Sequence, residues 1–145
     1  MFLKKYNELL LTQNINCVLS FSTKIYRTTQ KKITDVDSAI LHDMVHNGNN
    51  DAYGGFMSLD EIQELLQYDN VFLAGHGANH IELNKICSSK IKQSTIFAKD
   101  IADMCYDLNK LNLITNIFVF PYAYDDFLCS SKIVKQNKFK YIFAK

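Results

Sequence analysis

The sequence predicts an α/β fold in which a parallel sheet of about four or more strands is covered by helices. Two observations support this prediction: four short apolar runs have strand character, and helical patterns lie between most of them. The 145 residues include one Pro and five Gly, which excludes a collagen-like or low-complexity chain. Parallel strands need crossover connections, so an alternation of strands and helices favours a parallel sheet. Since no linker-like run divides the chain, we expect one domain over residues 1–145.

The first third of the chain predicts one strand among helical and loop segments. Apolar residues at helical spacing predict a helix over Phe2–Gln13, and the apolar run Ile15–Phe21 predicts a buried strand. Polar residues with Gly and Asn predict a long loop over Tyr26–Gly55 that contains one short helix, about Val36–His46. Ser22-Thr23-Lys24 follows the strand and is either a contact at the rim of the site or a plain loop, and we favour the plain loop.

Helical signals are clearest in the middle of the chain. Ser58 and Glu61 are spaced as a capping box, which predicts a helix that runs to about Tyr68. An apolar stripe predicts an amphipathic helix over Ile96–Leu111, with charged residues including Asp100 outside the stripe. The remaining predicted elements are strands at Val71–Ala74, Ile117–Phe120 and Phe139–Phe143 and a helix at about Leu128–Asn137.

Composition limits the classes of partner and reaction. Lys and Arg number 16 and Asp and Glu 15, giving a formal net charge of +1, so no overall electrostatic field favours binding of nucleic acid or an anionic membrane.

The apolar runs of the sequence are shorter than the roughly 20 residues that a membrane span needs, and the N-terminus has no signal pattern. We therefore expect a cytoplasmic protein. The four Cys form no CxxC pair, and GxGxxG, Walker, GxSxG and HExxH motifs do not occur.

Two histidines follow the strand expected at Val71–Ala74, in the order His76-Gly77-Ala78-Asn79-His80. At the start of a helix, this HxxxH spacing predicts two imidazoles on one face, which suits Zn²⁺ or a similar divalent metal. The alternative is a chance pair whose rings only cap or donate hydrogen bonds. Because ligands gather at the carboxyl ends of parallel strands, the position favours metal or polar-ligand binding.

A second HxxxH pair, His42 and His46, lies in the long loop region. Its simplest interpretation is a solvated helix face with titratable rings. If the loop folds over the strand ends, these histidines or the nearby Asp35 and Asp37 become candidates to complete a metal site or to transfer protons.

The segment from Pro121 to Asp126 ends the third predicted strand at the same edge as His76. Backbone amides there are candidate donors to a carbonyl or anionic oxygen, and Tyr122, Tyr124 and Asp125 suit the rim of a sugar site. The alternative is a turn in which the tyrosines pack and the acidic residues are solvated.

Five segments in this order resemble the polysaccharide deacetylase family, also called the NodB homology domain or carbohydrate esterase family 4. Cys17–Thr23 is similar to its ATFFVST-like strand, Gly55–Ile62 to its GFMSWDEI helix start, His76–His80 to its H(S/T)xxH motif, Phe118–Tyr122 to its FAYPYG or RxxPY motif, and Phe139–Phe143 to its GFKYAF strand. The resemblance implies a truncated (β/α) deacetylase barrel. It also implies metal-dependent hydrolysis of N- or O-acetyl groups on a carbohydrate.

The resemblance assigns roles to a few residues. The family holds a divalent metal, most often Zn²⁺, with one Asp and two His, and His76 and His80 match the two His. Tyr122, after Pro121, matches the residue whose backbone amide helps to form the oxyanion hole. The family's TFDD motif, the Arg of RxxPY and the late general-acid His have no match, and Gly77 replaces the usual Ser or Thr. Asp35, Asp37, His42 and His46 are the candidate substitutes for the absent Asp.

These departures leave three hypotheses open. The chain is a deacetylase-like hydrolase with a rebuilt metal site, a non-catalytic relative that binds carbohydrate or a partner, or one part of a split deacetylase. Since four strands leave open sheet edges, we expect a homodimer, a partner chain or a cover built from Thr28–Gly54.

Overall fold

The computed structural model describes residues 13–28, 36–82, 85, 89–122 and 127–143. The chain divides into two compact units, one comprising residues 1–18 and 25–72 and the other residues 19–24 and 73–145. The helix expected at Phe2–Gln13 lies, except for Gln13, outside the described residues. The organisation of residues 1–145 as one domain stays a prediction.

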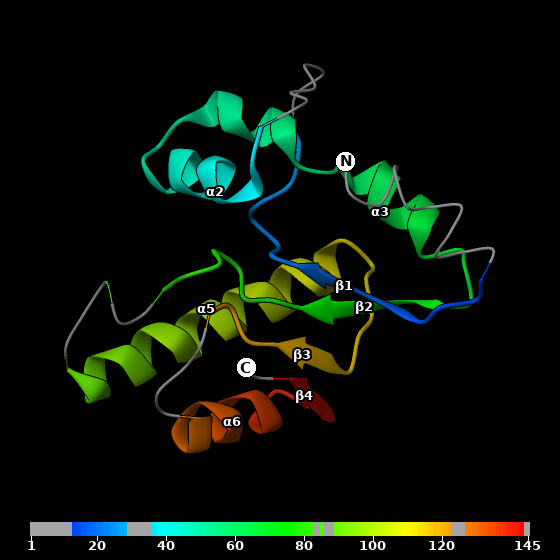
Figure 1. Ribbon diagram of the computed structural model, residues 1–145. Helices are drawn as coiled ribbons and strands as arrows, with labels where there is room; N and C mark the ends of the chain where they lie inside the picture. The colour runs from blue at the N-terminus through cyan, green and yellow to red at the C-terminus, as the bar shows by residue number, and fades with distance from the viewer. Residues whose placement is uncertain (1–12, 29–35, 83–84, 86–88, 123–126, 144–145) are drawn as a thin grey trace. The chain divides into compact units, whose positions relative to one another are not determined.

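A four-stranded sheet has the order β1-β2-β3-β4, so strands that are neighbours in the chain are neighbours in the sheet (Figure 1). The strands are β1 Cys17–Phe21, β2 Val71–Gly75, β3 Ile117–Val119 and β4 Tyr141–Phe143. Phe118 in β3 is in register with Gly75 in β2 and Ile142 in β4, and both pairings are parallel. The predicted α/β fold with a parallel sheet is therefore confirmed.

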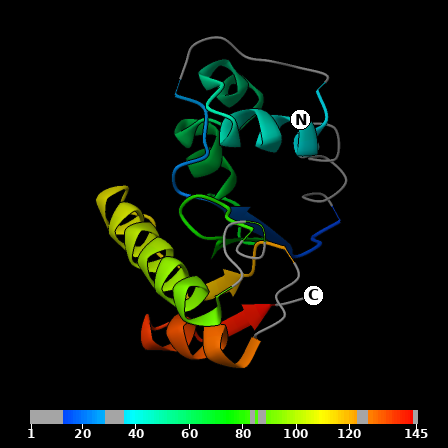
Figure 2. The same ribbon diagram turned by 90° about the vertical axis from the view of Figure 1, so that its left-hand side faces the viewer.

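Two helices cover one face of this sheet in the second unit, α5 (Lys90–Lys110) and α6 (Phe127–Gln136) (Figure 2). They supply the crossovers from β2 to β3 and from β3 to β4, as parallel strands require. The α5 helix begins six residues before the predicted start at Ile96. The apolar pattern did not predict a helix over residues 90–95, because the large apolar residue of this segment, Ile91, lies outside the buried stripe and is exposed.

The core of the second unit lies between the sheet and α5. Phe118 is fully buried, and its ring lies with centroids 5.0 Å from Phe120, 5.5 Å from Phe139 and 6.2 Å from Phe97. Side chains from the apolar stripe of α5 complete this core: Phe97, Ile101, Met104 and Leu108. Burial of these side chains fixes α5 against the sheet and so determines which of its residues face the strand ends.

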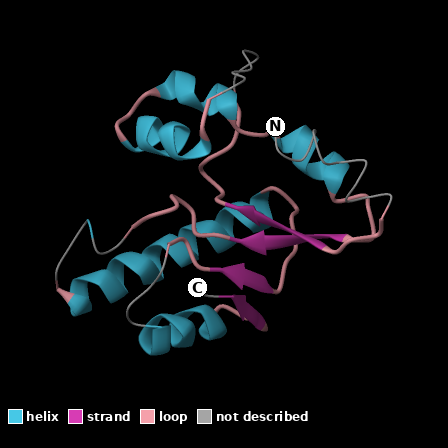
Figure 3. Ribbon diagram, in the orientation of Figure 1, coloured by secondary structure: helices cyan, strands magenta, loops and turns pink. Residues whose placement is uncertain are grey.

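The first unit contains α2 (Ser38–His46), the 3₁₀ helix η1 (Asn50–Gly55) and α3 (Leu59–Leu65) (Figure 3). The predicted capping box is confirmed: Ser58 N donates to Glu61 Oε2 (2.9 Å), and Glu61 N donates to Ser58 Oγ (3.3 Å). Arg27 Nη2 also donates to Glu61 Oε2, at 2.8 Å. In the described part of the region expected to be mostly loop, residues 26–28 and 36–55, η1 is thus a helix that was not predicted.

Among the described residues, no helix combines the length and the apolar character needed to cross a membrane. The longest of the described helices, α5, has 21 residues and carries Lys and Asp side chains along its length.

Candidate functional site

His76 and His80 lie on an irregular segment after β2, which we call the histidine loop (His76–His80). The prediction that this pair begins a helix is wrong. Gly77 has φ +76° and His80 has φ +52°, and this left-handed backbone does not continue into a right-handed helix. The two imidazole rings nevertheless lie together, with centroids 4.6 Å apart.

The ring of His76 is oriented by β3. Its Nδ1 lies 2.8 Å from the carbonyl oxygen of Val119. Since a carbonyl only accepts hydrogen bonds, Nδ1 carries the proton and donates it, which leaves a lone pair on Nε2. The backbone of His76 is held by the end of β1, because its N–H donates to Phe21 O (3.0 Å) and its C=O accepts from Ser22 Oγ (2.9 Å).

Burial lowers the pKa of His76 below its ordinary value of 6.5, while the hydrogen bond to the Val119 carbonyl acts in the opposite direction. Burial has the larger effect because it penalises the charged imidazolium. The ring is therefore neutral at neutral pH, the form in which histidine binds metals.

Tyr122 extends this row of rings from the end of β3. Its ring contacts His80 edge-on, with centroids 4.8 Å apart, and the residue is 40% exposed. Tyr122 has φ +59°, a left-handed conformation that costs a non-Gly residue about 1–2 kcal/mol. Pro121 before it is buried, whereas Tyr124 and Asp125 lie outside the described residues. Tyr122 and both histidines thus form a continuous row at the carboxyl ends of β2 and β3.

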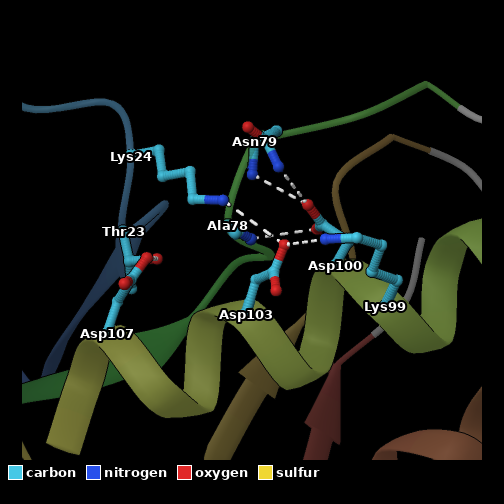
Figure 4. Close-up of polar contacts among 8 residues, drawn as sticks. All are labelled: Thr23, Lys24, Ala78, Asn79, Lys99, Asp100, Asp103 and Asp107. Carbon is cyan, nitrogen blue, oxygen red and sulfur yellow. Dashed lines mark hydrogen bonds and ion pairs between the residues drawn. The ribbon is translucent and has the colours of Figure 1, made fainter.

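A carboxylate that the sequence did not single out holds the histidine loop. Asp100 is 4% exposed, and its Oδ2 accepts from Ala78 N at 2.9 Å (Figure 4). Its Oδ1 accepts from Asn79 N at 3.0 Å and from Asn79 Nδ2 at 2.7 Å. The prediction that Asp100 lies outside the buried stripe of its helix is therefore wrong. Helical spacing could have found it, because Asp100 lies three residues after Phe97 and four before Met104, both buried.

The segment after β1 pairs with the histidine loop. Thr23 N donates to Gly77 O (3.3 Å), and Lys24 N donates to Ala78 O (2.9 Å). Both Ser22 and Thr23 are buried. The prediction of a loop at Ser22-Thr23-Lys24 is confirmed, since β1 ends at Phe21, and these hydrogen bonds join this loop to the histidine loop.

Two further acidic residues of α5 contact this segment rather than the histidine loop. Asp107 Oδ2 accepts from Thr23 Oγ1 at 2.9 Å, and Asp103 Oδ2 accepts from Lys24 Nζ at 3.3 Å (Figure 4). Asp103 also accepts from Lys99 Nζ at 2.7 Å, which lowers the pKa of Asp103 and raises that of Lys99.

The second histidine pair belongs to the first unit, on α2. His42 and His46 each offer a ring nitrogen, and these two atoms lie within 4.8 Å of each other. His42 is half-buried with its ring 5.1 Å from that of Phe56, and His46 is exposed. Asp37 is exposed just before α2, whereas Asp35 lies outside the described residues.

Among the solved structures that are similar to this chain are two from bacteria. One is IcaB from Ammonifex degensii, with a TM-score of 0.65 and 15% sequence identity, which covers 94% of this chain. The other is a de-N-acetylase from Aggregatibacter actinomycetemcomitans, with a TM-score of 0.68, 16% identity and 99% coverage. The chain spans 51% and 58% of the lengths of those two chains. No protein-family model and no curated protein matches it. At these identities the likeness establishes the fold, and this fold corresponds to about half of each neighbour.

Proposed function

We propose that this chain is a polysaccharide deacetylase-like protein that hydrolyses N- or O-acetyl groups on a sugar with a divalent metal. The observation that carries the proposal is the row formed by His76, His80 and Tyr122 at the carboxyl ends of β2 and β3. The likeness to a de-N-acetylase supports the same class of reaction.

The donor set of the histidine loop fits a divalent metal. Metal-binding histidines commonly donate the other ring N–H to a carbonyl or carboxylate, and His76 Nδ1 donates to Val119 O in this way. We therefore propose His76 Nε2 and one ring nitrogen of His80 as ligands. Two imidazoles suit Zn²⁺, whose other ligands in proteins are Cys, His, Asp, Glu or water. Asp35, Asp37, His42 and His46 remain the proposed substitutes for the absent aspartate.

A bound divalent metal would supply a water of lowered pKa and would polarise the acetyl carbonyl. The chain's own contribution would be to orient the acetyl group. We propose that the backbone N–H of Tyr122, which follows Pro121, donates to the carbonyl oxygen as charge develops on it. Tyr122 is 40% exposed and its ring contacts His80, so we propose that this ring offers an apolar face to a sugar ring.

The activity is tested by acetate release from N-acetylated and O-acetylated chitooligosaccharides, with added Zn²⁺ and with a chelator. We expect release with Zn²⁺ and none with chelator, and we expect His76→Ala and His80→Ala to abolish it. Asp103→Asn is the matched control, because Asp103 contacts only Lys24 and Lys99 in the hydrogen bonds described above. Metal binding without acetate release, together with binding of the intact sugar, would instead favour the non-catalytic carbohydrate-binding alternative.

Assembly is tested separately. Sheets with open edges tend to pair, so we propose a homodimer or a partner chain, and light scattering during size-exclusion chromatography measures the mass of the particle. A mass of twice 16.7 kDa supports the homodimer. A mass of 16.7 kDa would contradict the homodimer and would favour a partner chain that supplies the acid–base groups absent from this chain.

A further inference from the structure

We propose that Asp100 is the positioning residue of the candidate site: its carboxylate fixes the histidine loop and thereby sets the distance between the rings of His76 and His80. The loop-fixing role stands on the hydrogen bonds of Asp100. Its consequence for metal affinity rests on the proposed function.

Asp100 reaches the loop from a rigid element. It lies near the middle of α5, and its neighbours Phe97, Ile101 and Met104 are buried in the core of the second unit. Because the helix is fixed by this packing, the carboxylate has a fixed position relative to the sheet. A side chain with that support is suited to hold an irregular backbone segment in one conformation.

The histidine loop directs several N–H donors at the carboxylate of Asp100. Three N–H groups, two from the backbone of Ala78 and Asn79 and one from the Asn79 side chain, lie 2.7 to 3.0 Å from its two oxygens. The two backbone donors belong to Ala78 and Asn79, two of the three residues between His76 and His80. Hydrogen bonds to an ionised acceptor are the stronger kind, so these contacts fix the part of the chain that separates the two rings.

Gly77 gives a second, independent indication that the loop is built around this carboxylate. A Cβ at Gly77 would lie 2.5 Å from Asp100 Oδ2 and 3.6 Å from Pro121 Cγ. Only glycine leaves room for Oδ2 at its observed position, and only glycine adopts φ +76° without strain. The loop therefore has a residue without a side chain where Asp100 approaches it.

The same helix supplies a matched control. Asp103 lies one helical turn along α5 and accepts hydrogen bonds from Lys24 and Lys99, none of them in the histidine loop. Asp100→Asn and Asp103→Asn make the same chemical change three residues apart. Only the first replaces an acceptor of the loop amides.

The direct test measures amide hydrogen exchange by NMR in the full metal-free chain. In Asp100→Asn we expect exchange at Ala78 and Asn79 to rise about tenfold or more relative to the amide of His76, which donates to Phe21 O instead. We also expect the ring resonances of His80 to shift. Asp103→Asn should change neither. Unchanged exchange at both loop amides, or an equal rise at all sheet amides, would overturn the proposal.

A second variant guards against misfolding of Asp100→Asn. Asn79→Ala keeps the carboxylate and both backbone donors and removes only the side-chain donor at 2.7 Å. It should shift the His80 ring resonances by a smaller amount and leave the fold intact. No shift in this variant would contradict the proposed role.

Zn²⁺ titration by calorimetry tests the consequence for the site. Loss of a residue that holds metal ligands in place typically weakens metal binding by about 10- to 100-fold. We expect this loss of Zn²⁺ affinity for Asp100→Asn and not for Asp103→Asn. Faster loop exchange with unchanged Zn²⁺ affinity would refute the effect on the site. If the natural chain binds no Zn²⁺ at all, the proposed function fails, while the exchange rates still decide whether Asp100 fixes the loop.

Discussion

The Nδ1 atom of His76 lies 2.8 Å from the carbonyl oxygen of Val119, so the last residue of β3 orients the ring that follows β2. This contact depends on the parallel register that aligns Gly75 with Phe118. One backbone carbonyl thereby fixes both the tautomer and the direction of Nε2. The pairing of two strands, rather than a dedicated side chain, prepares this histidine for its proposed role as a ligand.

Protonation of His76 should make stability depend on pH. Burial lowers the pKa of His76 in the folded chain, whereas the unfolded chain has the ordinary value of 6.5. Well above that value the ring is neutral in both states, so its titration does not change the free energy of unfolding. As the pH falls below it, the unfolded chain binds the proton first, and the free energy of unfolding decreases.

Urea unfolding at intervals between about pH 7.5 and pH 5 measures this effect. His76→Asn is the matched variant, because the Asn side chain retains a donor near the Val119 carbonyl and does not titrate. We expect the natural chain to lose more stability than this variant over the interval. Equal losses would show that His76 is not protonated preferentially in the unfolded state.

Two glycines with similar backbone angles should respond differently to alanine. Gly48 has φ +79° and no atom within 4 Å of an added Cβ, whereas at Gly77 the Cβ would lie 2.5 Å from Asp100 Oδ2. Gly48→Ala should cost about 1 kcal/mol for the backbone angle alone. Gly77→Ala should cost about 1–3 kcal/mol more, because the carboxylate must move. Denaturant unfolding measures both, and equal costs would contradict the close approach of Asp100.

Phe118 should be the most sensitive strand residue of the second unit. It is fully buried among the rings of Phe97, Phe120 and Phe139. Phe118→Ala should destabilise the chain by about 3–5 kcal/mol through lost burial and a residual cavity. Phe143→Ala is the control, because Phe143 lies in β4 with 53% of its surface exposed. A cost for Phe118→Ala as small as that of the control would contradict the described core.

The order of elements could be predicted because each strand is a short apolar run bounded by polar residues or Pro. The helix boundaries were harder. The first six residues of α5 have no apolar periodicity, since Ile91 is exposed and the packed stripe begins with Gln93 and Phe97. Local pattern therefore located the strands well and the start of the longest helix poorly.

The candidate site was predicted as residue types rather than as geometry. The HxxxH spacing identified His76 and His80, but an ideal helix was the wrong backbone for them, because the positive φ of His80 has no local sequence signal. Val119 and His76 are separated by 43 positions, so their contact follows from strand register. Asp100 could have been predicted as a buried residue, because its spacing from Phe97 and Met104 places it on the buried side of α5.

The most direct measurement is the metal content of the purified full chain by inductively coupled plasma mass spectrometry, after incubation with Zn²⁺ and removal of unbound ions. His76→Ala and His80→Ala test the proposed ligands, His42→Ala and His46→Ala test the pair on α2, and Asp103→Asn is the control. Circular dichroism confirms that each variant is folded.

We predict about one Zn²⁺ per chain, retained in Asp103→Asn and lost in both His76→Ala and His80→Ala. Loss in the α2 variants as well would assign a further ligand to that pair. No bound metal in the natural chain, even with Zn²⁺ in excess, or full retention in both loop variants would contradict the proposed metal site.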